Sequence, residues 1–275
     1  MNWLVHPFAY GFMQRALVEA ILMSATCGLL GAIVVLRGLT FTGESLSHTL
    51  LPGAAVALAA GLPVLGGALV GGVAAATAIA LLLRRTEIGE EAAVGVVFTG
   101  SFAVGVILLS TRGTTRDLDS LLFGSILAVE PRDLWLGLGA ALVVLASCAL
   151  LARRFVLVAF DRAFADAMRL RSGLLDVLLL VALAGALTVA LRGVGTLLVL
   201  ALLVAPAAAA RLLARRVWTM LWLAPVLAVA ASVAGLEISY HVGAAAGPAI
   251  CLSAIALFAL ALGVRLVEHV RAHVH

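Results

Sequence analysis

The chain alternates between long apolar runs and short polar connections. Nine runs are almost free of charged residues, and each is bounded by charge or by Gly and Pro. About 20 apolar residues in a helix cross a bilayer. The pattern predicts an all-α polytopic membrane protein with about eight or nine transmembrane helices, near 16–36, 45–61, 63–83, 92–111, 134–152, 177–191, 193–210, 217–236 and 242–264.

Two connections are longer than the others. The connection at 112–133 is acidic and holds a short apolar piece at 121–127, which is too short to span. It predicts one short re-entrant or interfacial segment, with an ordinary outer loop as the alternative. The connection at 153–176 is the longest polar stretch.

Within this longer connection, Asp161 is placed to cap a short helix. The apolar residues that follow it keep helical spacing, which predicts an amphipathic helix outside the bilayer. Such a helix either lies on the membrane or docks into a partner protein. The apolar positions are Phe164, Ala167, Met168 and Leu170.

Composition agrees with a membrane protein, since 64% of the residues are hydrophobic and only 12% are charged. All 18 basic residues are Arg, so a phosphate-binding loop that needs Lys cannot form. Any ATP that powers this protein is therefore bound by another subunit. No basic cluster is interleaved with aromatic residues, which argues against nucleic acid as a partner.

The arginines are distributed unevenly over alternate connections. With nine spans, one side of the membrane receives 13 of them and the other side receives five. Short cytoplasmic loops carry the excess of positive charge. This distribution predicts a multi-pass protein of the cell membrane, with the 153–176 loop and the C-terminus in the cytoplasm.

One ionisable pair lies inside an apolar run. Glu44 and His48 are four residues apart, so they share one helix face and can hold one cation. An ionisable group within a membrane is costly unless it has a function. The alternative is a structural pair that bonds to neighbouring backbone. Pro52, one turn further on, either frees backbone carbonyls toward a pathway or merely kinks the helix.

Other ionisable residues are weaker candidates for the pathway. Glu19 lies in the first run and is a candidate gate, although a place near the outer interface explains it as well. His241, in the last outer connection, either helps to accept the ion or is a solvated loop residue. Three residues near the C-terminus form either a cytoplasmic metal-capture tail or a frayed end or tag remnant: His269, His273 and His275.

Several stretches resemble one family. Residues 43–53, GESLSHTLLPG, are similar to the G-D-x-[LI]-[SA]-H-x-x-L-P-G signature of ABC-transporter permeases that import zinc, manganese or iron, the ABC-3 family. The family's L-F-G-S-[IL]-L, F-D-P-x-x-A and G-x-L-L-V segments resemble three further stretches, at 122–127, 160–176 and 195–208. Glu44 replaces the usual Asp of the family, and Arg162 stands where Pro is common.

The resemblance implies a single permease domain over 1–275 that works as a transport subunit and not as an enzyme. Two copies would line one pathway, and two cytoplasmic ATPases would bind ATP. An extracytoplasmic metal-binding protein would deliver the ion. No cofactor would be bound permanently. The residues that would couple to the ATPase are Asp161, Phe164, Ala165 and Met168.

The resemblance also implies that the transported ion is a divalent transition metal. Imidazole with carboxylate suits zinc, manganese and iron, and imidazole ligation favours zinc over manganese. The alternative function is a stand-alone secondary metal transporter or channel. Such transporters often carry several coupling acids in mid-span, whereas here Glu44 is essentially alone.

Overall fold

The computed structural model describes residues 10–85, 88–112, 131–193 and 196–274, and every regular element within these ranges is a helix. The helices are α1 (Gly11–Arg37), α2 (Thr40–Ala59), α3 (Val64–Arg85), α4 (Glu90–Arg112), α6 (Pro131–Phe160), α7 (Arg162–Ala167), α8 (Ser172–Gly193), α9 (Thr196–Leu213), α10 (Val217–Val242) and α11 (Ala246–Val274).

Each of the nine apolar runs coincides with one long helix in the described part of the chain. Seven of these helices are long and apolar enough to cross a membrane, fewer than the eight or nine expected. Hydroxyl residues, a carboxylate and an imidazole lower the hydropathy of α2. In α9 the apolar helix is shorter, Leu198–Leu213. The expected re-entrant segment at 121–127 lies outside the described residues.

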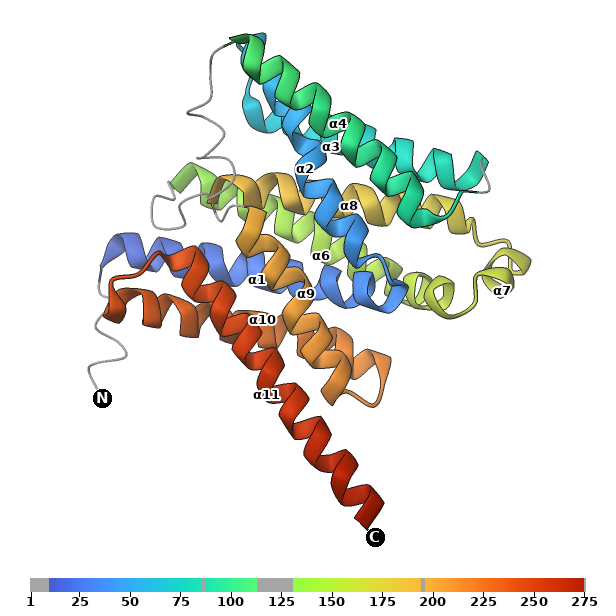
Figure 1. Ribbon diagram of the computed structural model, residues 1–275, viewed down its shortest axis with the longest axis vertical. Helices are drawn as coiled ribbons and strands as arrows, with labels where there is room; N and C mark the ends of the chain where they lie inside the picture. The colour runs from blue at the N-terminus through green and yellow to red at the C-terminus, as the bar shows by residue number, and fades with distance from the viewer. Residues whose placement is uncertain (1–9, 86–87, 113–130, 194–195, 275) are drawn as a thin grey trace.

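The helices form three groups in Figure 1. The first group, α2, α3 and α4, lies on one side, and α1, α6 and α8 cross the middle of the molecule. On the opposite side lie α9, α10 and α11. The apolar window of α1 is 67% buried, compared with 17% in α4 and in α11. The central helix is therefore α1, while α4 and α11 expose apolar side chains that suit contact with lipid or with another subunit.

Small residues bring α2 and α3 into backbone contact. A Cβ atom added at Gly53 would collide with the carbonyl oxygen of Gly67 and would lie 2.8 Å from the Cα atom of Gly71. Close crossings of this kind need glycine on both helices. Gly53, which follows Pro52 in the 43–53 stretch, therefore fixes α2 against α3.

We expect Gly53→Ala to destabilise the folded protein by about 1–3 kcal/mol, because the new methyl group would push against backbone that cannot yield cheaply. Gly66→Ala is the matched control, since a Cβ atom added there meets nothing within 4 Å. Thermal unfolding of both purified variants measures the difference. Equal melting temperatures for Gly53→Ala and wild type would show that the crossing tolerates a side chain.

Candidate metal centre

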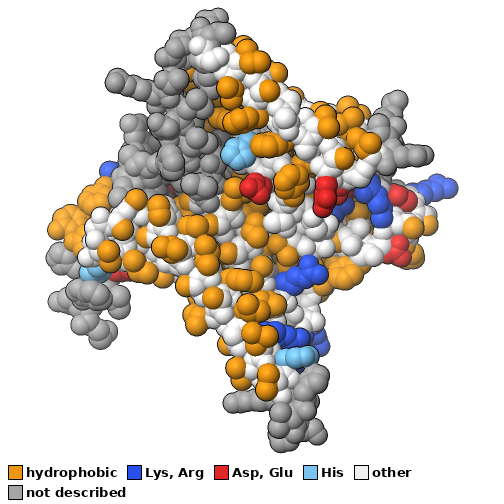
Figure 2. Space-filling view, in the orientation of Figure 1, with side chains coloured by type: hydrophobic (Ala, Val, Ile, Leu, Met, Phe, Trp, Pro, Cys, Tyr) orange, Lys and Arg blue, Asp and Glu red, His pale blue; other side chains and the backbone are white. Residues whose placement is uncertain are grey.

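The expected metal pair lies on one open face of α2. Glu44 is exposed and His48 is half-buried, while Leu46 and Leu50 on the other side of the helix are fully buried. Figure 2 shows a histidine and an acidic side chain next to each other on the face that α2 presents. The two residues are one turn apart, about 6 Å along the helix axis at ~1.5 Å per residue. One cation can therefore reach both side chains.

Two aromatic rings from α4 hold the imidazole of His48. The ring centroid of Phe98 lies 5.7 Å from that of His48, and the centroid of Phe102 lies 6.3 Å away in an edge-on arrangement. Phe98 and Phe102 are themselves four residues apart and stacked at 6.1 Å. These contacts restrict the orientation of the imidazole. The sequence analysis missed both phenylalanines, although their helical spacing in the 92–111 run was a usable signal.

Pro52 lies on the same face as the pair, a further turn along α2. A proline has no N–H, so the helical hydrogen bond from residue 52 to the carbonyl of His48 cannot form. That carbonyl oxygen therefore lacks its usual helical donor, and Pro52 packs against α4, where a Cβ atom added at Gly105 would lie 3.2 Å from the Pro52 nitrogen. The side-chain ligand candidates on this side of α2 are therefore one carboxylate and one imidazole.

This set of ligands is incomplete within one chain. Among the described residues, no group of three or more His, Cys, Asp and Glu side chains could hold a metal ion. Transition metals take four to six ligands. A cation at Glu44 and His48 would therefore need water or ligands from another chain to complete its coordination.

Glu19 is not part of this face. Its side chain is buried, and its carboxylate lies against α6, where a Cβ atom added at Gly137 would be 2.9 Å from Oε2. The structure therefore places Glu19 in the contact between α1 and α6, inside the bundle.

His241 lies on a helix and not in a loop, because α10 continues to Val242 before Gly243 ends it with a left-handed backbone. Its Nδ1 atom is 2.9 Å from the carbonyl oxygen of Glu237 and 3.6 Å from the Glu237 carboxylate. Glu237 and His241 thus repeat the spacing of Glu44 and His48 on another helix. The sequence analysis overlooked Glu237 because the apolar run was expected to end at 236.

The remaining histidine candidates lie at the end of α11. His269 is exposed on this helix. The side chain of His273 and residue His275 lie outside the described residues.

The helix expected in the 153–176 connection is present as α7. Asp161 accepts a hydrogen bond from the backbone N–H of Phe164 at 2.8 Å, as expected of a capping residue. Ala165 is buried, whereas Phe164 and Met168 are 52% and 58% exposed. The helix is shorter than its apolar spacing suggested, because Arg169 adopts a left-handed backbone with φ of 59°. The apolar pair Phe164 and Met168 therefore faces outward beside a short helix.

The turn after α7 is held by a second capping carboxylate. The backbone N–H of Ser172 donates to Asp166 Oδ1 at 3.3 Å. Hydrogen bonds from the Ser172 side chain and backbone lower the pKa of Asp166. The carboxylate is therefore held in its charged form at the start of α8.

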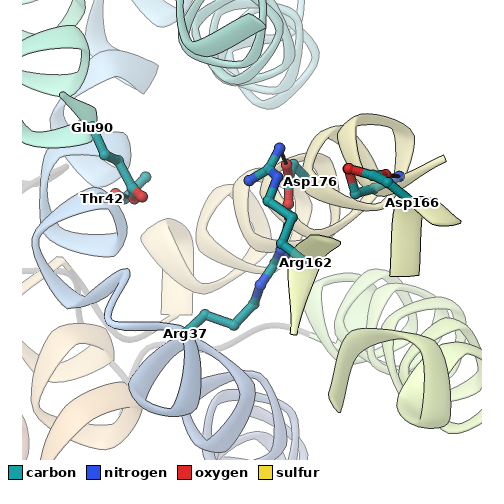
Figure 3. Close-up of polar contacts among 7 residues, drawn as sticks. Arg37, Thr42, Glu90, Arg162, Asp166 and Asp176 are labelled. Atoms are coloured by element: carbon teal, nitrogen blue, oxygen red, sulfur yellow. Dashed lines mark hydrogen bonds and ion pairs between the residues drawn. The ribbon is translucent and has the colours of Figure 1, made fainter. Parts of the chain in front are cut away.

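A charged cluster joins α7 to the bundle, and the sequence analysis missed it. Arg162 of α7 and Arg37 of α1 both pair with Asp176 of α8. Thr42 of α2 donates to Glu90 of α4 at 3.0 Å. Figure 3 shows Arg37 and Arg162 meeting at Asp176, with the Thr42–Glu90 pair set apart from them. The cluster lies at the end of the molecule where α7 projects (Figure 1).

Known proteins resemble this chain in sequence. A manganese transport system membrane protein, MntC, of Halalkalibacterium halodurans is 39% identical over 174 residues, which is 63% of this chain. The matched segment spans only 60% of that relative. A Haemophilus influenzae protein named "Probable iron transport system membrane protein" is 33% identical over 261 residues, covering 95% of this chain and 96% of the relative.

The fold is similar to that of a solved transporter. In the structure of PsaBC from Streptococcus pneumoniae in complex with Fab, one chain matches with a TM-score of 0.83 and 32% identity, covering 94% of each chain. The model of the ABC 3 transport family matches residues 9–265. Because this match and that of the Haemophilus protein span nearly the whole sequence, the chain is a multi-pass membrane protein of the ABC 3 transport family.

Proposed function

We propose that this chain is the membrane permease subunit of an ATP-binding-cassette importer and that it moves a divalent transition metal into the cytoplasm. The observation that carries this proposal is the Glu44–His48 pair on the open face of α2, within a chain of the ABC 3 transport family. Family membership disfavours the alternative of a stand-alone transporter. The metal is substrate here, and ATP belongs to the partner subunits.

Manganese or iron is the proposed cargo. The relatives named above are described as manganese and iron transport proteins, so they do not support the preference for zinc expected from imidazole ligation. Glu44 adds a hard oxygen ligand beside one imidazole. Oxygen ligands suit manganese better than a purely nitrogen or sulfur site would.

We propose that the complete importer contains a second permease copy and further subunits. A second permease copy facing the open side of α2 would duplicate Glu44 and His48 across a two-fold axis, giving up to four side-chain ligands. Two ATPases would bind the exposed apolar pair of Phe164 and Met168 beside α7, and an extracytoplasmic protein would deliver the metal. Glu237 and His241 lie in the last turns of α10. We propose that they bind the ion when it first enters the permease.

The end of the bundle that carries α7 is proposed to face the cytoplasm, together with the C-terminus. In this arrangement α2 and α9 also lie within the membrane, which restores the count of nine spans. Polar α2 is tolerated there because most of its hydroxyl groups are buried against protein.

Cysteine labelling tests this orientation. Single cysteines at Ala167 and Val270, both exposed, should resist a membrane-impermeant thiol reagent in intact cells and react after the cells are opened. These single cysteines are introduced into a variant in which the three native cysteines have been replaced. Labelling of both sites from outside would reverse the orientation, and labelling of only one would change the number of spans between them.

The proposed function is tested by transport in vesicles. Proteoliposomes that contain this chain with its ATPase subunits would be offered Mn²⁺, Fe²⁺ or Zn²⁺ at equal free concentration. We expect accumulation of Mn²⁺ or Fe²⁺ that requires ATP hydrolysis. Accumulation without ATP would favour the stand-alone transporter, and a failure to move any of the three metals would contradict the proposal.

A further inference from the structure

One carboxylate links three helices at the end of the bundle where α7 lies. Oδ2 of Asp176 is 2.8 Å from Nη2 of Arg162, and Oδ1 of the same residue pairs with Arg37. The side chains of Arg37 and Asp176 are only 7% and 14% exposed, whereas that of Arg162 is 54% exposed. Asp176 therefore connects the surface helix α7 to the buried end of α1.

A second link in the same place reaches the helix of the metal pair. Thr42 of α2 donates to Glu90 of α4 at 3.0 Å. Both residues line a cavity of about 130 Å³ that Arg37 and Asp176 also line. Thr42 and Glu44 are two residues apart, so a shift of the first turn of α2 moves the metal pair with it.

The cavity leaves the cluster room to rearrange. Nη1 of Arg37 is buried and has no hydrogen-bond partner among the described residues. A buried guanidinium favours a full set of acceptors, and the carboxylate of Glu90 lines the same cavity. An approach of α4 toward α1 would let Glu90 exchange its bond to Thr42 for one to Arg37. Such an exchange would change how α2 is held, because Thr42 would lose its partner on α4.

We propose that Asp176 is a positioning residue that transmits movement of α7 to α1, and that Glu90 and Thr42 pass this movement on to α2. The inference rests on the proposed function, since the ATPase would move α7 and the metal pair would respond. Ion pairs suit this task because they are directional and, when buried, are weakly screened. A movement of Arg162 pulls on the carboxylate that also holds Arg37.

Two variants separate coupling from folding. Asp176→Asn keeps the shape of the side chain but leaves two arginines without their counter-charge. Arg162→Gln removes only the exposed ion pair with Asp176 and keeps the buried ion pair between Arg37 and Asp176. This variant should therefore fold even if Asp176→Asn does not. Arg162→Lys restores the charge. Glu268→Gln is the matched control, because it breaks an exposed ion pair with Arg265 on α11.

The first measurement is the metal moved per ATP hydrolysed in proteoliposomes of the complete complex. We expect this ratio to fall at least tenfold in Asp176→Asn and severalfold in Arg162→Gln, with ATPase association unchanged. Arg162→Lys should recover most of the ratio, and the control should match wild type. A wild-type ratio in Arg162→Gln overturns the inference, as does a loss of ATPase binding, since Arg162 would then contact the ATPase directly.

A second measurement does not depend on transport. Spin labels at Ala167, the last residue of α7, and at the exposed Val56 of α2 report the distance between the two helices. ATP should change this distance in wild type and in Glu268→Gln but not in Arg162→Gln. If the distance responds as expected while no metal moves, the proposed function is wrong but the transmission of movement from α7 to α2 is supported. If ATP shifts the distance equally in Arg162→Gln, the proposed transmission is wrong.

Discussion

His48→Ala is expected to lower metal uptake at least tenfold while the protein still inserts into the membrane. The imidazole is one of the two side-chain ligands proposed on α2, and even the loss of an outer partner of a ligand costs about 10- to 100-fold in metal affinity. Folding should survive, because His48 is only half-buried on an open face and its removal takes polarity out of a largely apolar helix. Uptake of Mn²⁺ and Fe²⁺ at equal expression measures the effect.

Variants of the neighbouring positions sharpen this prediction. Glu44→Gln keeps the size of the side chain and removes its charge, so uptake should fall more than stability. Glu44→Asp, the usual residue of the family, should retain transport. Val56→Ala on the same face of α2 is the matched control and should transport as wild type does. Normal uptake by His48→Ala would refute the assignment of the pair as the metal site.

Phe164→Asp is expected to weaken association with the ATPase at least tenfold and to abolish ATP-driven uptake. Phe164 is 52% exposed on a helix of six residues, so its ring is available to a partner. Burying such a ring in an interface contributes about 1.5–3 kcal/mol, and about 1.4 kcal/mol corresponds to a tenfold change in affinity. An aspartate there would in addition bury a charge. Co-purification of the ATPase with the permease measures the loss.

Phe164→Leu is the companion variant, because it keeps an apolar side chain at the same place and should retain most of the association. Both variants should fold, since the contact that holds α7 inward is made by Ala165 and the cap by Asp161. Full ATPase binding and full uptake by Phe164→Asp would favour the other interpretation of α7, a helix that lies on the membrane surface.

The sequence by itself located the helices and placed Glu44 and His48 on one helix face, because both depend on short-range periodicity. Each apolar run became one long helix, and the four-residue spacing of Glu44 and His48 placed both on one face of α2. The cap of α7 by Asp161 was local in the same way and is confirmed. The ends of the helices were predicted less well than their positions. The helix α10 continues to Val242 and not to the predicted end at 236, so His241 lies on a helix with Glu237 and not in a loop.

Only the tertiary structure decided which distant residues meet. Asp176 and Arg37 are 139 residues apart, so no local sequence pattern predicts their ion pair. The packing of α4 on α2 brings Phe98 and Phe102 onto His48, and the packing of α6 on α1 buries Glu19 inside the bundle. Helix periodicity determines which face a residue occupies, whereas backbone contacts such as that of Gly53 determine which helix that face meets.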